Sequence, residues 1–276
     1  MPIHQSPAEE HDDHGGLHRD VPALVGRRDM LRVIGGLGVA GLLAACGVET
    51  SSSSPNTTNS VPTTGSAGVV DPGIEIPDET AGPYPADGSN GPNVLDDGGI
   101  VRADLTTSFG GSSGVAEGTP IRFSLSVVDA ASGDPVVGAA VYLWHCTADG
   151  RYSIYEIADQ NYLRGIQVAD EAGRITYNSI FPGCYAGRWP HAHFEVYPSL
   201  EQATSGSGST KISQLALPRA DCETVYADSR YGNSAESLTR LSLDTDNVFR
   251  DGWADQLATV EGSPSAGYTA SLLVRV

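Results

Sequence analysis

The run HAHFEVY at residues 191–197 alternates between apolar residues and residues with polar groups. An extended strand places successive side chains on opposite faces, so the apolar residues pack on one face while His191 and His193 share the other. The run therefore predicts a strand in a sheet with one packed face and one chemical face. Two imidazoles on one face lie within reach of a single metal ion, although imidazole alone does not select among zinc, copper and iron.

Several other segments share this strand character. Segments that alternate polar and apolar residues, or are rich in Val, Ile and Tyr, occur at 121–129, 139–145, 174–181, 191–197, 212–217 and 268–276. Turn clusters such as SGDP and DEAG separate several of them, and helical periodicity is weak throughout. We therefore predict an all-β fold, an antiparallel β-sandwich with long active-site loops.

Two tyrosines are candidates to complete a metal site. Tyr185 stands six residues before His191 and follows a Pro-Gly turn that can aim its ring toward the histidines, and Tyr152 ends the segment ADGRY (148–152), which comes after the predicted strand 139–145. A phenol with an ordinary pKa of about 10 coordinates as phenolate only to a strong Lewis acid, and its hard oxygen favours Fe(III). The tyrosines therefore direct the prediction toward ferric iron.

The N-terminal segment has the features of an export signal. Residues 26–32 read GRRDMLR, the twin-arginine pattern, and the apolar stretch 33–45 leads to a lipobox-like LAAC that ends at Cys46. Because this stretch is too short for a permanent transmembrane helix, we expect residues 1–45 to be a cleaved signal peptide. The mature chain then starts at a lipidated Cys46 on the extracellular face of the cell membrane, or is secreted. The alternative is an uncleaved N-terminal anchor or a wrongly assigned start codon.

The remainder of the chain divides into a linker and one domain. Residues 46–70 are rich in Ser, Thr and Pro, have almost no apolar residues to bury, and predict a lipidated tether. Residues 71–276 are long enough for one catalytic domain with a sizeable core. Three cysteines fall in this domain, and the sequence leaves open which of Cys146, Cys184 and Cys222 form a disulfide.

The charge balance excludes one class of partner. The whole chain has a formal net charge of −18, and residues 46–276 keep 12 basic and 28 acidic residues, a net charge of −16. Such a surface repels phosphate backbones, so we expect no nucleic-acid binding. The lipid anchor at Cys46 is the only membrane contact that we predict.

Longer motifs resemble the intradiol ring-cleavage dioxygenases, the family of the catechol and protocatechuate enzymes. The resemblance extends from residue 79 to the end of the printed sequence, and the overall pattern looks closer to extracellular members of the family than to the cytoplasmic ones. The motifs that carry it are ETAGPY (79–84), GAAVYLWHCTADGRYS (138–153), YLRGIQ (162–167), PGCYAGRWPHAHF (182–194) and SQL (213–215). Each motif alone is weakly specific, but together they are highly specific.

The resemblance implies a metal centre and a reaction. The family holds a mononuclear, non-haem Fe(III) with two tyrosinates and two histidines, which match Tyr152, Tyr185, His191 and His193. Its substrates are a catechol-type aromatic ring and O2, and the ring is cut between the two hydroxyl-bearing carbons to give a cis,cis-muconate-type product. The substrate displaces the second tyrosinate, here Tyr185, which then accepts a substrate proton.

The same resemblance implies roles for residues around the metal. Arg188 matches an arginine that stabilises negative charge on the substrate, and Gln214 matches a glutamine that polarises the intermediate. Gly82, Pro83 and Tyr84 match a segment that lines the substrate pocket.

Two departures from the better-known family members leave the oligomeric state and the substrate open. The chain lacks the helical region through which catechol dioxygenases dimerise, so its oligomeric state is undetermined. It also has Ala186 and Gly187 where protocatechuate enzymes carry bulkier residues, so the sequence does not identify which catechol is used.

Two other functions remain as alternatives. His191, His193 and Glu195 on one strand face form a possible two-His-one-carboxylate metalloenzyme site, although three ligands from one strand are poorly placed to surround an ion. The other alternative is a non-catalytic β-sandwich lipoprotein that binds a ligand, because sandwiches serve many functions.

Overall fold

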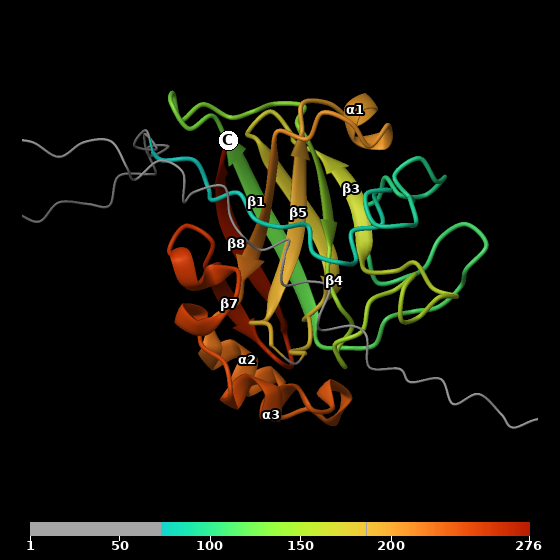
Figure 1. Cartoon of the computed structure of the whole chain (residues 1–276), viewed down its shortest axis with the longest axis vertical. Coiled ribbons are helices and arrows are strands. Elements are labelled where there is room, and N and C mark those ends of the chain that lie inside the picture. The colour runs from blue at the N-terminus through green and yellow to red at the C-terminus, as the bar shows by residue number, and fades with distance from the viewer. Residues whose placement is uncertain (1–72, 186) are drawn as a thin grey trace, which may run out of the picture. The chain divides into compact units, whose positions relative to one another are not determined.

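The computed structural model describes residues 73–185 and 187–276 (Figure 1). The expected signal peptide at 1–45 and the expected tether at 46–70, including Cys46, lie outside these residues. Within the described part of the chain, no helix is long and apolar enough to cross a membrane.

The described residues form two four-stranded sheets. In spatial order, the first sheet contains β4 (Arg174–Ile180), β1 (Pro120–Val128), β8 (Gly267–Arg275) and β7 (Thr259–Ser263). The second contains β3 (Arg164–Val168), β2 (Ala140–Trp144), β5 (His191–Tyr197) and β6 (Lys211–Ala216). All neighbouring strands pair antiparallel except β1 and β8, which run parallel. The predicted all-β sandwich is confirmed, with one parallel pair added.

The predicted strands coincide with β1, β2, β4, β5, β6 and β8 to within about one residue at each end. Strands β3 (RGIQV) and β7 (TVEGS) were not predicted, because each is short and contains a glycine and polar residues that interrupt the alternation. The helices are short: α1 (Leu200–Thr204), α2 (Arg219–Val225), α3 (Ser234–Thr239) and the 3-10 turns η2 (Ser229–Tyr231), η3 (Leu243–Thr245) and η4 (Phe249–Asp251). Helix α1 lies at one end of the sandwich, and α2 and α3 lie at the other (Figure 1).

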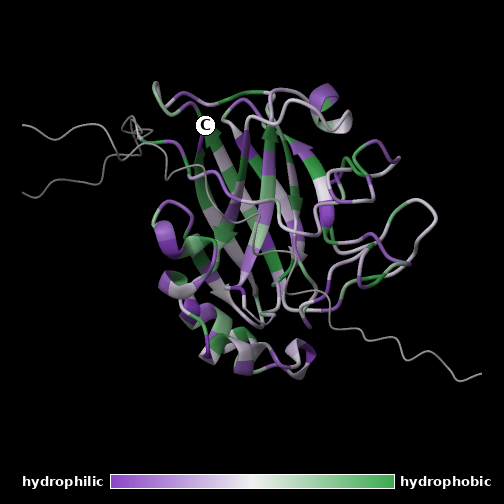
Figure 2. Ribbon diagram, viewed as in Figure 1, coloured by the Kyte–Doolittle hydropathy of each residue, from purple (hydrophilic) through white to green (hydrophobic). Residues whose placement is uncertain are grey.

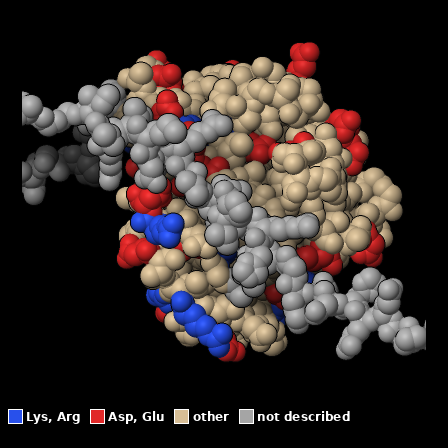
Figure 3. Space-filling model, viewed as in Figure 1, with Lys and Arg blue, Asp and Glu red and all other residues tan. Residues whose placement is uncertain are grey.

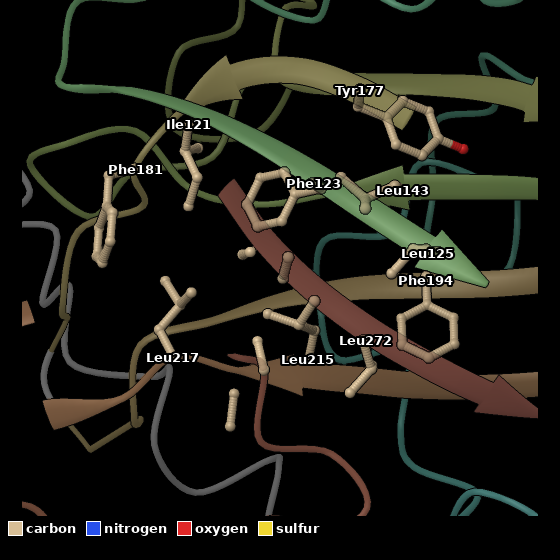
Figure 4. Packing of buried hydrophobic residues seen from close by; sticks show 14 of the residues in the cluster. Ile121, Phe123, Leu125, Leu143, Tyr177, Phe181, Phe194, Leu215, Leu217 and Leu272 are labelled. Atoms are coloured by element: carbon tan, nitrogen blue, oxygen red, sulfur yellow. The ribbon is translucent and has the colours of Figure 1, made fainter. Parts of the chain in front are cut away.

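The main hydrophobic core lies between the two sheets (Figure 4). Phe123 and Leu125 of β1 and Leu272 of β8 meet Phe194 of β5 and Leu215 of β6 there. Strand β4 alternates buried and exposed residues along most of its length, and β1 and β8 also bury every second side chain, because the other face of their sheet meets solvent. Apolar residues accordingly follow the strands in Figure 2.

The second sheet is covered on both faces. Every residue of β2 and of β5 is buried. A second hydrophobic cluster covers the face that points away from the main core, and joins Tyr142, Trp144 and Ile166 of the sheet to Leu95 and Phe109 of the long segment before β1. Loops therefore enclose the face of β5 that carries the two histidines.

The cysteines and the surface charges complete the description. Cys146, Cys184 and Cys222 are all buried and free, so none of the three forms a disulfide. Carboxylates are scattered over the face shown in Figure 3, where basic side chains are few.

Candidate metal and substrate site

Four donor atoms converge on the covered face of the second sheet. Tyr152 comes from the turn after β2, Tyr185 from the connection between β4 and β5, and the two histidines from β5. Tyr152 Oη lies 3.4 Å from Tyr185 Oη, which lies 3.3 Å from His191 Nε2, which in turn lies 3.0 Å from His193 Nε2. The structure thus brings together all four residues predicted as metal ligands.

The spacing and chemistry of these atoms fit a single metal ion. Ligands about 2.1 Å from an ion and roughly 90–110° apart are about 3.0–3.4 Å from one another, the range found here. His191 Nδ1 donates to the carbonyl of Trp189, which leaves a lone pair on Nε2 directed at the other donors. Two phenol oxygens and two imidazole nitrogens are a donor set suited to a hard trivalent ion.

Burial sets the protonation of the donors. Desolvation lowers the pKa of His191 and that of His193 far below the ordinary value for a histidine. Both imidazoles are therefore neutral and able to coordinate a metal ion. Desolvation likewise raises the pKa of both Tyr152 and Tyr185, so each phenol keeps its proton unless a cation stands beside it. The site is therefore a pair of metal-ready nitrogens and a pair of phenols that only a strong Lewis acid deprotonates.

The two tyrosine-bearing loops are in direct contact. A Cβ placed on Gly183 would lie 2.3 Å from the carbonyl oxygen of Ala148, so only glycine permits this approach. Ser234 Oγ accepts from the backbone N–H of Cys184 and donates to the same Ala148 carbonyl. These contacts join the loop of Tyr152 to the loop of Tyr185.

The segment 82–84 forms a wall against the ligands. Gly82 has φ +72°, and a Cβ there would lie 3.2 Å from Cε1 of His193. The ring of Tyr84 packs on that of Tyr152 with centroids 4.8 Å apart. Pro83 is exposed, and its carbonyl accepts from Asn90 Nδ2. Gly82 and Tyr84 thus contact the candidate ligands themselves, whereas Pro83 lies on the outer side of the wall.

Arg188 and Gln214 are also brought together. Gln214 lies opposite His193 in the pairing of β5 with β6. Its Oε1 accepts from Arg188 Nη2 at 2.6 Å, and its Nε2 donates to the carbonyl of Thr80 at 2.9 Å. Burial alone would lower the pKa of the Arg188 guanidinium, but the neighbouring Tyr185 and Asp246 outweigh it and hold that pKa above its ordinary value. Arg188 therefore brings a permanent positive charge to the site.

Comparisons with known proteins agree with this geometry. Residues 90–200 match the family model described as Dioxygenase. A 70-residue segment is 46% identical to chlorocatechol 1,2-dioxygenase of Rhodococcus opacus, over 25% of this chain and 27% of that protein. The resemblance to intradiol ring-cleavage dioxygenases is confirmed.

Solved structures support the fold. An intradiol ring-cleavage dioxygenase from Tetranychus urticae superimposes with a TM-score of 0.57 at 22% identity, over 73% of this chain and 94% of that one. A second solved dioxygenase gives a TM-score of 0.58 at 21% identity, over 74% of this chain and 94% of that one. The aligned segment spans only about a quarter of the curated relative, 27% of its length.

The family match covers part of the candidate site. Tyr152, Tyr185, Arg188 and both histidines lie inside residues 90–200. The 82–84 wall and Gln214 lie outside that range, and the structure places them beside the ligands independently of the match.

Sequence reasoning missed two buried charged residues of this candidate site. Arg164 on β3 is 1% exposed and donates to the carbonyls of Tyr84, Pro85 and Ser153, to Ser153 Oγ and to Tyr142 Oη. It thereby ties the wall to the residue that follows Tyr152. Asp246 is fully buried and ion-paired with Arg188. Arg164 lies within the YLRGIQ motif, but no sequence signal marks Asp246.

The two-His-one-carboxylate alternative is not assembled. Glu195 is one strand repeat beyond His193, and its Oε2 accepts from the hydroxyl of Tyr197. Burial raises the pKa of Glu195 to about 7. Among residues 73–185 and 187–276, no group of three or more His, Cys, Asp or Glu side chains is close enough to hold a metal ion. The rise of the strand carries Glu195 away from the histidine nitrogens.

Proposed function

We propose that this chain is a non-haem Fe(III) dioxygenase that cleaves catechol-type rings between the two hydroxyl-bearing carbons with O2. The product is a cis,cis-muconate-type diacid. The observation that carries the proposal is the convergence of two phenol oxygens and two neutral imidazole nitrogens, with neighbouring donors 3.0–3.4 Å apart. Tyr152, Tyr185, His191 and His193 would hold the iron, which would supply a Lewis acid that binds the catechol oxygens and activates the ring toward O2.

The protein side chains divide the remaining work. Tyr185 Oη, which lies between Tyr152 Oη and His191 Nε2, would be a phenolate when iron is bound, and it would then accept a proton from the incoming catechol hydroxyl. Arg188 stands beside that oxygen and stabilises negative charge that develops on the substrate. Gln214, held by Arg188 and by the carbonyl of Thr80, fixes the direction of the guanidinium. Tyr84 confines the substrate ring and excludes water on the side of Tyr152.

The reaction is tested with iron-loaded protein in an oxygen electrode, with catechol, protocatechuate, hydroxyquinol and methylcatechols as substrates. We expect stoichiometric oxygen uptake and the ultraviolet absorbance of a cis,cis-muconate-type product. We also expect a burgundy resting colour from tyrosinate-to-iron charge transfer that shifts when catechol is added. Iron-replete protein that is colourless contradicts the proposal, and coloured protein that binds catechol without consuming oxygen supports the ligand-binding alternative.

The site of action is a separate proposal. We propose that residues 1–45 direct twin-arginine export and that Cys46 carries the lipid anchor, because the double arginine, apolar stretch and cysteine occur in the required order. Mass spectrometry of protein from the membrane fraction should find an N-terminus at a lipid-modified Cys46. The variant Cys46→Ala should then appear in the soluble fraction, and an unprocessed N-terminus in the wild type would contradict this proposal.

A further inference from the structure

Asp246 is a fully buried carboxylate with several backbone and side-chain donors. It accepts from Arg188 Nε at 3.1 Å, from the Trp189 backbone N–H at 2.6 Å, and from the backbone N–H groups of Val248 and Phe249 at 2.8 and 3.2 Å. Both its oxygens are engaged, and its side chain is 0% exposed. It therefore has no free oxygen with which to contact a substrate.

The groups that Asp246 holds are in turn bonded to residues of the proposed metal and substrate site. Arg188 Nη2 donates to Gln214, while the Trp189 carbonyl accepts from His191 Nδ1 and so fixes which nitrogen of His191 faces the other donors. Phe249, whose N–H Asp246 also binds, places its ring 6.4 Å from the ring of His191. One carboxylate thus organises the residues on either side of the Arg188–Trp189 peptide.

The buried guanidinium has a competing choice of partners. The phenols of Tyr185 and Tyr152 lie close enough to Arg188 to raise its pKa, so as phenolates they would attract it. A guanidinium drawn onto a ligand phenolate would neutralise the oxygen that is required for the metal and would leave the substrate side. The Asp246 carboxylate, a fixed anion bound to Nε, holds the guanidinium in place while Nη2 remains directed at Gln214.

We propose that Asp246 is a positioning residue of the dioxygenase, which acts through Arg188 by holding its guanidinium at the substrate side of the donor set. This inference rests on the proposed function. It gives the segment between η3 and η4, which belongs to no recognised motif, a part in the reaction.

The test compares Asp246→Asn with Asp244→Asn, each alone and combined with Arg188→Gln. Asp244 is a matched control because it lies two residues before Asp246, in η3, and accepts from Trp253 Nε1 instead of from Arg188. Iron content, resting colour, kcat and KM are measured with the catechol that the wild type turns over fastest. If Asp246→Asn does not fold, Asp246→Glu replaces it, since the longer side chain keeps the charge but moves it.

A second measurement is independent of iron and of activity. In metal-free protein the Arg188 Nε–H should give a distinct, exchange-protected ¹H–¹⁵N signal, assigned by its absence in Arg188→Lys. We expect the signal to persist in Asp244→Asn and to lose its protection in the Asp246 variant. If the wild type consumes no oxygen with any catechol, the proposed function fails while this measurement still tests the Asp246–Arg188 contact.

The expected result is a loss of about 10–100-fold in kcat for Asp246→Asn with unchanged iron content and little change in KM. In the Arg188→Gln background the same change should have less than about a twofold effect, because its target is gone. Asp246→Asn activity within about twofold of Asp244→Asn overturns the proposal. An equal loss in both backgrounds also overturns it, because Asp246 would then act only on stability or on His191.

Discussion

The two sheets of this sandwich share one core but differ on their outer faces. The outer face of the β4-β1-β8-β7 sheet is open to solvent, with exposed polar residues such as Arg122, Thr176 and Ser271. The outer face of the β3-β2-β5-β6 sheet is covered by loops, and β2 and β5 are buried at every position. A sheet needs only one buried face for stability, so the second cover requires a different explanation.

Buried polar groups supply that explanation. Apart from tyrosines, only Ser179 among the residues of the first sheet is both polar and buried, whereas the second sheet buries Arg164, His191, His193, Glu195, Lys211, Ser213 and Gln214. Burying such groups costs free energy unless each finds a partner, so their concentration on one sheet marks the functional face. The contrast shows that the long loops cover one sheet face and exclude water from one site.

The largest effect should come from removing a donor on the covered face. Tyr152→Phe deletes one phenol oxygen, and we expect iron affinity to fall by more than about 100-fold, beyond the 10–100-fold cost of losing an outer-shell partner. Tyr177→Phe is the matched control, because this buried phenol lies in the main core and donates to the carbonyl of Val141. Iron titration of both metal-free variants measures the difference. Equal iron affinity in the two would contradict the assignment of Tyr152.

The same substitution on the two sheets should have unequal effects on stability. Arg164→Met removes a buried guanidinium that donates to three backbone carbonyls, and we expect the free energy of unfolding to fall by about 3–5 kcal/mol. Arg122→Met on the exposed face should change it by less than about 0.5 kcal/mol. Urea unfolding of the metal-free proteins gives both values. Similar changes in the free energy of unfolding for the two variants would contradict the claim that only one of the two outer sheet faces is covered.

A pH effect should come from the core that the sheets share. His145 is buried beside Ser179, and desolvation lowers its pKa from 6.5 to about 4. In the unfolded chain His145 takes up a proton near pH 6.5. The contribution of neutral His145 to the free energy of unfolding is therefore complete above that pH and is lost as the pH falls toward 4. The loss amounts to about 3 kcal/mol at 1.36 kcal/mol per pKa unit. Stability of metal-free His145→Gln should therefore depend less on pH between 6.5 and 4 than that of the wild type; parallel pH profiles would contradict this.

The smallest effect concerns two serines. Ser213 on β6 is buried and donates to the carbonyl of Pro77, so Ser213→Ala should cost about 1 kcal/mol. Ser271 on β8 is exposed, and Ser271→Ala should have an effect within about 0.5 kcal/mol of zero. Thermal unfolding measures both stability changes. A cost for Ser271→Ala as large as that for Ser213→Ala would contradict the view that the outer face of the first sheet is open to solvent.

The sequence allowed prediction of those features that depend on local pattern. The alternation in β5 placed both histidines on one face, and the tyrosine motifs gave the other two donors. Strand β7 was not predicted, because TVEGS has too few apolar residues to show which of its faces is buried. Asp246 lies 58 residues from Arg188, and the partners of Arg164 are mainly backbone carbonyls of distant loops, which leave no pattern in the sequence. Tertiary packing alone creates these contacts.

A crystal structure of the iron-loaded resting protein tests the central claim most directly. We expect one ion on the covered face of the β3-β2-β5-β6 sheet, bonded to the oxygens of Tyr152 and Tyr185 and to Nε2 of His191 and His193. An iron-replete crystal in which either phenol oxygen lies well outside bonding distance of the ion would contradict the account.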